Sequence, residues 1–120
     1  MEYEYYLPDQ FDDYTLLTTI DEPEGKTYVY MSIQGNLLQF SFTYGNKTSL
    51  YVDAENSDIY SGTVDEQPAD IYISKVPDTA SVIVWNDPQS GALLVLSAYA
   101  DRNTLPILAK KVEKRIIPSN

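Results

Sequence analysis

The sequence predicts an α+β fold, in which an antiparallel sheet of about seven strands carries one C-terminal helix packed on one face. Between residues 37 and 44, apolar and polar side chains alternate, as they do in a strand with one covered face. Two apolar runs, at 81–85 and 92–97, flank a run of turn formers at 86–91. This arrangement predicts a hairpin.

After the hairpin the period changes, and apolar residues recur at helical spacing. This spacing predicts a closing helix over residues 103–115. Its expected apolar stripe consists of Leu105, Leu108, Ala109, Val112 and Ile116. Asn103 is the expected N-cap, because Pro106 is tolerated only in the first turn of a helix. The stripe is expected to cover one face of the sheet.

Clusters of turn formers divide the rest of the chain into further predicted strands. These strands are expected at 15–20, 27–33, 48–52, 63–66 and 69–75. Short turns separate 27–33, 37–44 and 48–52, so these three are expected to form an antiparallel meander. The polar run 53–62 is expected to be irregular. The chain is interpreted as a single domain, 1–120, with residues 1–10 as an N-terminal lead-in.

The 120 residues carry a formal net charge of −10, which is unevenly distributed. Residues 1–101 hold three basic and seventeen acidic side chains, whereas residues 102–120 hold five basic and one acidic. A strongly acidic chain repels a nucleic-acid backbone, so no nucleic-acid partner is expected. The basic end is interpreted as a solvated helix face, with a partner-binding patch as the alternative.

The chain contains neither cysteine nor histidine. A disulfide framework, a Cys/His zinc site and a nucleophile–histidine–acid triad are therefore excluded. We expect no cofactor, no catalytic residue and no enzyme activity. No run approaches the roughly 20 apolar residues of a membrane span. No membrane insertion of this segment is expected, although an N-terminal anchor could have been removed from a longer protein.

Carboxylates offer one candidate site. Asp53, Glu55 and Asp58 form an oxygen-rich run after a predicted strand, and alternate oxygen ligands in a loop can hold calcium. The run lacks the glycine and terminal glutamate of an EF-hand loop, so its other interpretation is a solvated acidic loop. An acidic enzyme with paired carboxylates, as in glycoside hydrolysis, is a further alternative.

Tyrosine is unusually frequent, with eleven residues against three phenylalanines and one tryptophan. Tyr28 and Tyr30 share one face of their predicted strand, opposite the aliphatic face of Val29, Met31 and Ile33. If the helix covers the aliphatic face, these tyrosines are exposed and can anchor a partner. The alternative is that the rings cap an open sheet face. The candidate binding residues are Tyr28, Tyr30, Tyr51, Tyr72 and Trp85.

Two functions follow from these candidates. The first is a non-catalytic module that binds a protein partner, or a second copy of itself, through the tyrosine face. The alternative is a small-ligand or carbohydrate-binding module that uses the exposed tyrosines and Trp85. For Trp85 itself, core or rim packing competes with a role in stacking against a ligand.

Several short motifs resemble those of one family. Residues 6–11 (YLPDQF) resemble a YLP-x-x-F motif. The later motifs are an acidic strand at 64–66, apolar strands at 71–73 and 94–97, and Val84–Trp85. From Tyr6 to Val112 the sequence resembles domain-of-unknown-function family 4367 (DUF4367). The resemblance implies a Gram-positive, extracytoplasmic, membrane-anchored domain with a sensory or regulatory role, and it assigns no catalytic residue.

Overall fold

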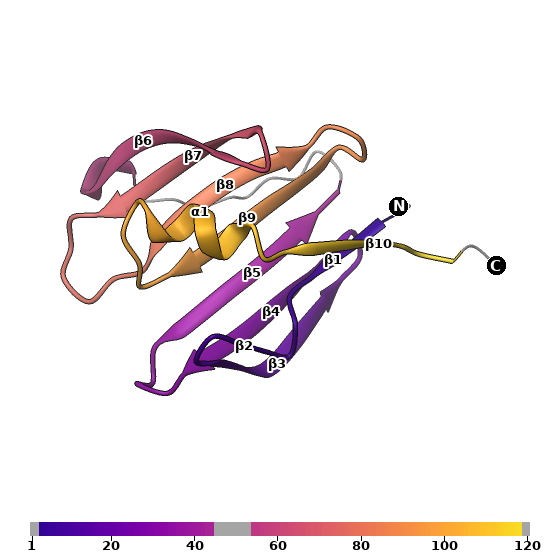
Figure 1. The fold of residues 1–120 in the computed structure, drawn as a ribbon, viewed down its shortest axis with the longest axis horizontal. Coiled ribbons are helices and arrows are strands. Elements are labelled where there is room, and N and C mark those ends of the chain that lie inside the picture. Colours follow the sequence, from indigo (N-terminus) through magenta and orange to yellow (C-terminus); the bar gives the residue numbers. More distant parts are fainter. Residues whose placement is uncertain (1–2, 45–53, 119–120) are drawn as a thin grey trace.

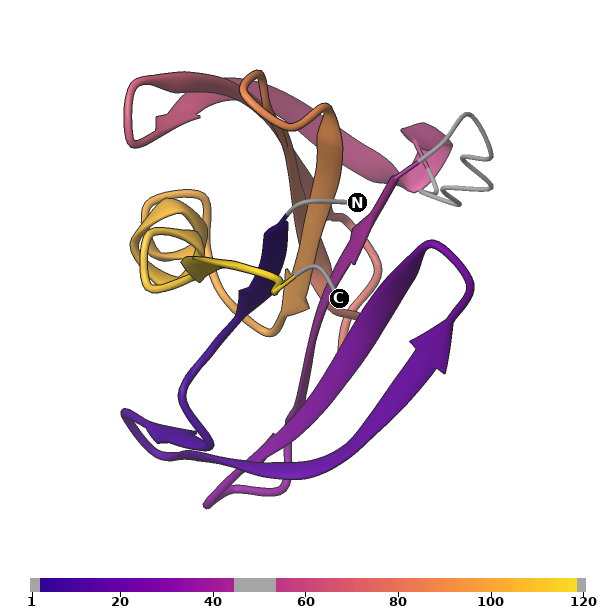
Figure 2. The ribbon, with the colours of Figure 1, turned by 90° about the vertical axis from the view of Figure 1, so that its right-hand side faces the viewer.

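The computed structural model describes residues 3–44 and 54–118, which are dominated by an antiparallel sheet. Eight described strands form the main sheet in the order β2-β3-β4-β5-β9-β8-β7-β6 (Figure 1). Their bounds are β2 (Gln10–Phe11), β3 (Tyr14–Glu22), β4 (Gly25–Ser32), β5 (Leu37–Thr43), β6 (Ser57–Val64), β7 (Gln67–Ser74), β8 (Ser81–Asp87) and β9 (Ala92–Ala98). Figure 2 shows that the sheet is strongly curved. The predicted fold class is confirmed.

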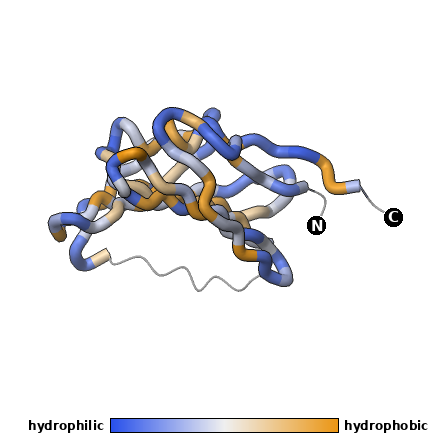
Figure 3. Tube along the Cα trace, turned by 90° about the horizontal axis from the view of Figure 1, so that it is seen from below, coloured by the Kyte–Doolittle hydropathy of each residue, from blue (hydrophilic) through white to orange (hydrophobic). Residues whose placement is uncertain are grey.

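Alternating side chains create the two faces of this sheet. In β5, β8 and β9 every second residue is buried, and these residues face the concave side. Phe40, Leu96 and Ile83 are paired across the three strands and are fully buried. Figure 3 shows that hydrophobic and hydrophilic residues alternate repeatedly along the chain. The concave side therefore holds the core.

Helix α1 (Thr104–Ala109) lies in the hollow of the curved sheet (Figures 1 and 2). Its buried residues, Leu105, Leu108 and Ala109, belong to the core, and the helix contacts β6, β8 and β9. A C-terminal helix packed on one face is therefore confirmed. Asn103 is the N-cap by position, as predicted, but the Asp101 carboxylate accepts the backbone N–H groups of Asn103 and Thr104 at 3.0 and 2.8 Å.

The predicted length of this helix, 103–115, is wrong. The helix ends at Ala109, where the N–H of Lys111 and that of Val112 each bond back three residues. The chain then forms β10 (Glu113–Ile116), which pairs antiparallel with β1 (Tyr3–Tyr6). Pairing with a distant strand supplies backbone partners that outweigh the weak helical preference of a few residues.

The β1–β10 pair lies on the concave side, beside α1 (Figures 1 and 2). Tyr5 and Leu7 are buried, and the Tyr5 ring packs on the Phe42 ring at 5.3 Å between centroids. The Tyr44 hydroxyl donates to the Tyr3 carbonyl at 2.8 Å. Residues 3–7 are therefore an integral part of the core, although they were expected only to lead into the domain.

Two further expectations need correction. The run 53–62 was expected to be irregular, but its described part forms the turn of 3₁₀ helix η1 (Ala54–Asn56) and most of β6. Of the meander expected for 27–33, 37–44 and 48–52, the pairing of β4 with β5 is present, and β5 takes β9 as its other neighbour. The predicted strand at 48–52 lies outside the described residues.

Candidate functional site

The tyrosines predicted to be exposed are buried. Tyr28 is 6% exposed and Tyr30 is fully buried, because both face the concave side. The Tyr28 ring stacks on Phe40 at 5.9 Å, and the Tyr30 hydroxyl donates to the Leu7 carbonyl at 3.0 Å. Burial raises the pKa of Tyr28 to about 12. The prediction that the helix covers the aliphatic face is wrong: Val29, Met31 and Ile33 lie on the other side.

The remaining aromatic candidates do not form one surface. Trp85 is 6% exposed and stacks on Phe40 at 6.4 Å, so core packing is its main role. Tyr72 is half-buried and paired with Val82, whereas its neighbour Ile71 faces the core. Tyr72 therefore lies on the convex face, opposite Tyr28 and Tyr30. Tyr51 lies outside the described residues.

The candidate metal ligands are not gathered either. Glu55 is exposed in η1, and the Asp58 carboxylate lies 3.7 Å from the Lys75 ammonium. Asp53 lies outside the described residues. Within residues 3–44 and 54–118, no three acidic side chains lie close enough to share a metal ion.

A groove runs between β6 and α1. Three adjoining cavities form it, and successive cavities share Thr63, Val64, Asp65 and Pro106 as lining residues. Residues 60–66 of β6 and its turn form one wall, and residues 102–110 of α1 and its approach form the other. We name this feature the β6–α1 groove. Its first cavity, of about 410 Å³, is lined by Tyr60, Ser61, Gly62, Thr63, Ile71, Arg102, Asn103 and Pro106.

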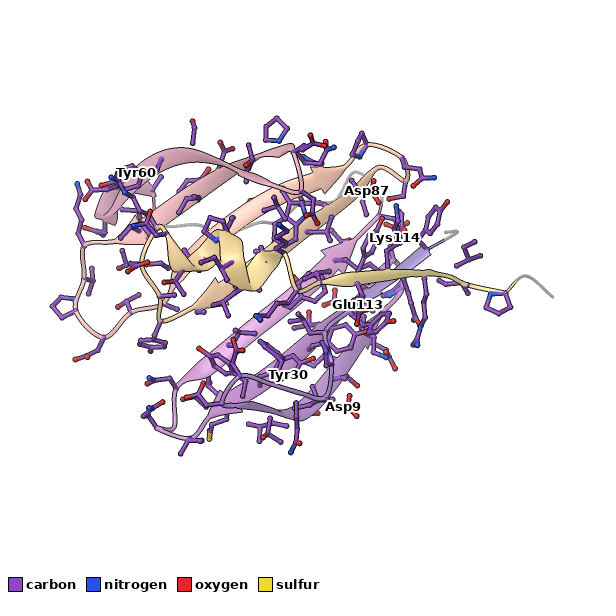
Figure 4. All side chains as sticks on the ribbon, viewed as in Figure 1. Asp9, Tyr30, Tyr60, Asp87, Glu113 and Lys114 are labelled. Carbon is purple, nitrogen blue, oxygen red and sulfur yellow. The ribbon has the colours of Figure 1, made fainter. Side chains whose placement is uncertain are left out.

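At its far end the groove opens into a cavity of about 250 Å³, whose walls include Tyr5, Trp85, Asp87 and Lys114. Figure 4 shows Tyr60 near one end of α1 and Asp87 with Lys114 beyond the other. The groove therefore follows the helix for its whole length.

Two cations of the groove are free of carboxylates. Among the described residues, Arg102 and Lys110 have no ion-pair partner. The Arg102 guanidinium instead lies 4.4 Å from the centroid of the Tyr60 ring. The other described cations, Lys26, Lys75, Lys111, Lys114 and Arg115, all pair with carboxylates. The unsatisfied positive charge of the described chain therefore lies beside this groove.

Asp87 accepts two side-chain hydrogen bonds at the far end of the groove. Its Oδ2 atom accepts the Tyr5 hydroxyl at 2.5 Å and the Lys114 ammonium at 3.0 Å. Partial burial acts to raise the pKa of Asp87, but these hydrogen bonds outweigh it and the pKa is lowered. Burial and the contact with Asp87 raise the pKa of Tyr5. Near neutral pH Asp87 stays a carboxylate and Tyr5 stays a phenol. The pair is therefore suited to holding the strands together and not to proton transfer.

The sequence interpretation missed this groove. It placed Arg102 and Lys110 in the basic C-terminal segment. Because it treated most of β6 as irregular, it did not predict the strand that forms the opposite side of the groove. The same interpretation expected Lys111, Lys114 and Arg115 either to be solvated or to bind a partner. The structure pairs them with Asp12, Asp87 and Glu4 of the same chain.

These features define a small α+β domain whose curved antiparallel sheet holds a short helix and a strand pair in its hollow. Residues 4–112 match the family described as a domain of unknown function (DUF4367), and the chain belongs to that family. The expected resemblance is thereby confirmed. Neither a curated protein nor a solved structure matches the chain. No described helix is long and apolar enough to cross a membrane.

Proposed function

We propose that this domain is a non-catalytic, extracytoplasmic interaction module with a sensory or regulatory role, and that it binds a polypeptide partner in the β6–α1 groove. One observation supports this most: the groove places an edge strand opposite a helix flanked by two cations, Arg102 and Lys110, that have no ion-pair partner among the described residues. An edge strand presents backbone N–H and C=O groups that a partner chain can use. The tyrosine face expected from the sequence has no part in the proposal.

The β6 edge is long and lies beside the groove. Among the described strands, β6 has eight residues and pairs only with β7. At the opposite edge β2 covers only Tyr14 and Thr15 of β3, but no residue of that strand lines the groove. Ser61 and Thr63 are exposed on β6, and Ile107, at 60% exposure, adds an apolar surface on α1. A groove of this kind suits an extended segment better than a compact ligand.

Because the chain has no cysteine, the groove can be blocked by one introduced thiol. Thr63→Cys, labelled with a bulky maleimide, fills the middle of the groove. Ile33→Cys, labelled in the same way, is the matched control, because Ile33 is 84% exposed and lies away from the groove. Peptides selected on the unlabelled wild type from a random display library should lose binding only to the labelled Thr63→Cys protein. Failure to select any peptide, or equal effects of the two labels, would refute the proposal.

The extracytoplasmic location is supported by the family resemblance and has its own test. An epitope-tagged copy of the native gene product in intact cells of the source organism should be cleaved by added protease. Protection of the tag until the cells are lysed would contradict this part of the proposal.

A small ligand is the second candidate, and the cavity at the far end of the groove favours it. Aromatic rings of Tyr5 and Trp85 meet the charged groups of Asp87 and Lys114 there, a combination that suits a polar ring such as a sugar. Trp85 is the single tryptophan and lines this cavity, so its fluorescence responds to a ligand bound there. A saturable change with one member of an oligosaccharide panel would support this function, and an unchanged spectrum throughout would remove it.

A further inference from the structure

We infer that the segment held in the β6–α1 groove is an extended, acidic peptide, which adds a strand to β6 and sets a carboxylate against Arg102. This inference rests on the proposed function and specifies its ligand. It combines three independent features of the groove: its strand edge, its charge and its apolar centre.

The first feature is the strand edge. Tyr60 and Gly62 of β6 face the concave side, Ser61 and Thr63 alternate with them and are exposed, and all four residues line the groove. A peptide paired with β6 would send every second side chain toward α1. Gly62 has no side chain to narrow the groove at this point. A Cβ atom there would lie 2.9 Å from the Cδ1 atom of Ile71.

The second feature is charge. Around Arg102 the lining groups are hydroxyls, an amide and apolar atoms, and no carboxylate is among them. Near Lys110 the groove is also lined by Asp65 and Glu66, so the positive charge is partly offset there. In a chain with a net charge of −10, the Arg102 end is thus the place that favours an anionic side chain. A guanidinium holds a carboxylate through two parallel hydrogen bonds.

The third feature is the apolar centre. Pro106 lines the two cavities that meet at the middle of the groove, and Ile107 lines one of them. Neither side chain can satisfy a polar group. We therefore expect the peptide to carry an apolar residue opposite α1, at an alternate position from the acidic residue that reaches Arg102.

The test uses peptides selected from a random display library on the wild-type domain and then synthesised. Asp or Glu should be enriched at one position, and its replacement by Asn or Gln should weaken binding by about tenfold or more. Arg102→Glu should weaken binding similarly, whereas Lys75→Glu, which removes a paired cation outside the groove, should change it less than about threefold. Unchanged melting temperatures show that both variants are folded.

Backbone methylation tests strand addition directly. In a paired edge strand, alternate amides of the peptide point toward β6. N-methylation of one alternate set should abolish binding, and methylation of the other set should leave it within about threefold. A scrambled peptide of the same composition should not bind, since net charge alone does not fix a register.

The outcomes separate the two proposals. Selected peptides could be blocked by the label at Thr63→Cys and yet bind equally well after the carboxylate is replaced, after Arg102→Glu or after N-methylation. The acidic-strand inference is then wrong, and the groove remains a binding site. If the label has no effect on any selected peptide, the proposed function itself fails.

Discussion

The Tyr5 hydroxyl donates to the Asp87 carboxylate at 2.5 Å, across 82 positions of sequence. The same carboxylate oxygen accepts the Lys114 ammonium at 3.0 Å. One acidic group thus joins both strands of the β1–β10 pair to the hairpin of β8 and β9. The two ends of the described chain are held over the concave face by a polar contact, in addition to the packing of Tyr5 and Leu7.

Removing this hydroxyl should destabilise the domain. Tyr5→Phe keeps the ring in the core but takes a hydrogen bond from a charged acceptor, which is worth about 1.5–3 kcal/mol. We expect the free energy of unfolding, measured with urea, to fall by about 1–2 kcal/mol, because Lys114 still satisfies part of Asp87. Tyr6→Phe is the matched control: the Tyr6 ring keeps its contact with Arg115, and stability should change by less than about 0.5 kcal/mol. Equal losses in the two variants would contradict this account.

Stability should fall at acidic pH, partly through Asp87. Its pKa is lower in the folded protein than in the unfolded chain, so its contribution is present above the unfolded value and is lost as the pH falls through the folded one. Between pH 7 and pH 3, Asp87→Asn should therefore lose less stability than the wild type. Asp101, whose pKa is also lowered by hydrogen bonds to Thr104, keeps its own contribution in both proteins. Parallel curves of unfolding free energy against pH would disprove the role given to Asp87.

The turn between β6 and β7 is strained. Asp65 and Glu66 connect the paired residues Val64 and Gln67, and both have positive φ, at 47° and 71°. A side chain at such a φ costs roughly 1–2 kcal/mol, and glycine avoids this cost. The greater freedom of glycine in the unfolded chain offsets part of that gain. We expect Glu66→Gly to raise the unfolding free energy by about 0.5–1 kcal/mol.

The two-residue turn between β3 and β4 offers the control for this change. Pro23 and Glu24 connect the paired residues Glu22 and Gly25, and Glu24 is not among the described residues with positive φ. Glu24→Gly should therefore lower stability. The explanation fails if both glycine variants shift the urea midpoint in the same direction.

Helix α1 should contribute to stability through its inner face alone. Leu105 is fully buried against the sheet, so Leu105→Ala should cost about 2–5 kcal/mol. Ile107 is 60% exposed on the same helix, so Ile107→Ala should cost less than about 1 kcal/mol. Similar losses for both, measured by urea unfolding, would mean that the helix does not pack as described.

Local patterns in the sequence predicted much of this fold. The alternation at 37–44 and the hairpin at 81–97 depend on side chains close in the chain, and both appear as β5, β8 and β9. The buried stripe of α1 was predicted for the same reason, with Leu105, Leu108 and Ala109 all in the core. What these patterns cannot supply is the partner of a distant strand. The predicted helix therefore ran on to residue 115, whereas residues 113–116 pair with residues 3–6.

The face of β4 was assigned wrongly for a physical reason. Alternation separates Tyr28 and Tyr30 from Val29 and Met31, but it does not say which set faces inward. The register with β5 decides this, because Tyr28 is paired with Phe40 and Tyr30 with Leu38. The strong apolar face of β5 thus places the tyrosines of β4 in the core, where the Tyr30 hydroxyl donates to the Leu7 carbonyl.

The candidate site was beyond sequence reasoning because it depends on the curvature of the sheet. Arg102 and Tyr60 are 42 positions apart, and only the bending of β6 over α1 brings the guanidinium onto the ring. The unpaired state of Arg102 and Lys110 likewise becomes visible only when the partners of the other cations are known.

Amide hydrogen exchange of β6, measured by NMR with and without a selected peptide, tests the central claim most directly. The account predicts that alternate amides within residues 60–63 exchange quickly in the free domain and become protected in the complex, because they donate to the added strand. Amides of β3 should be unchanged. Protection confined to β3 or to the convex face, or none along β6 at saturating peptide, would contradict the account.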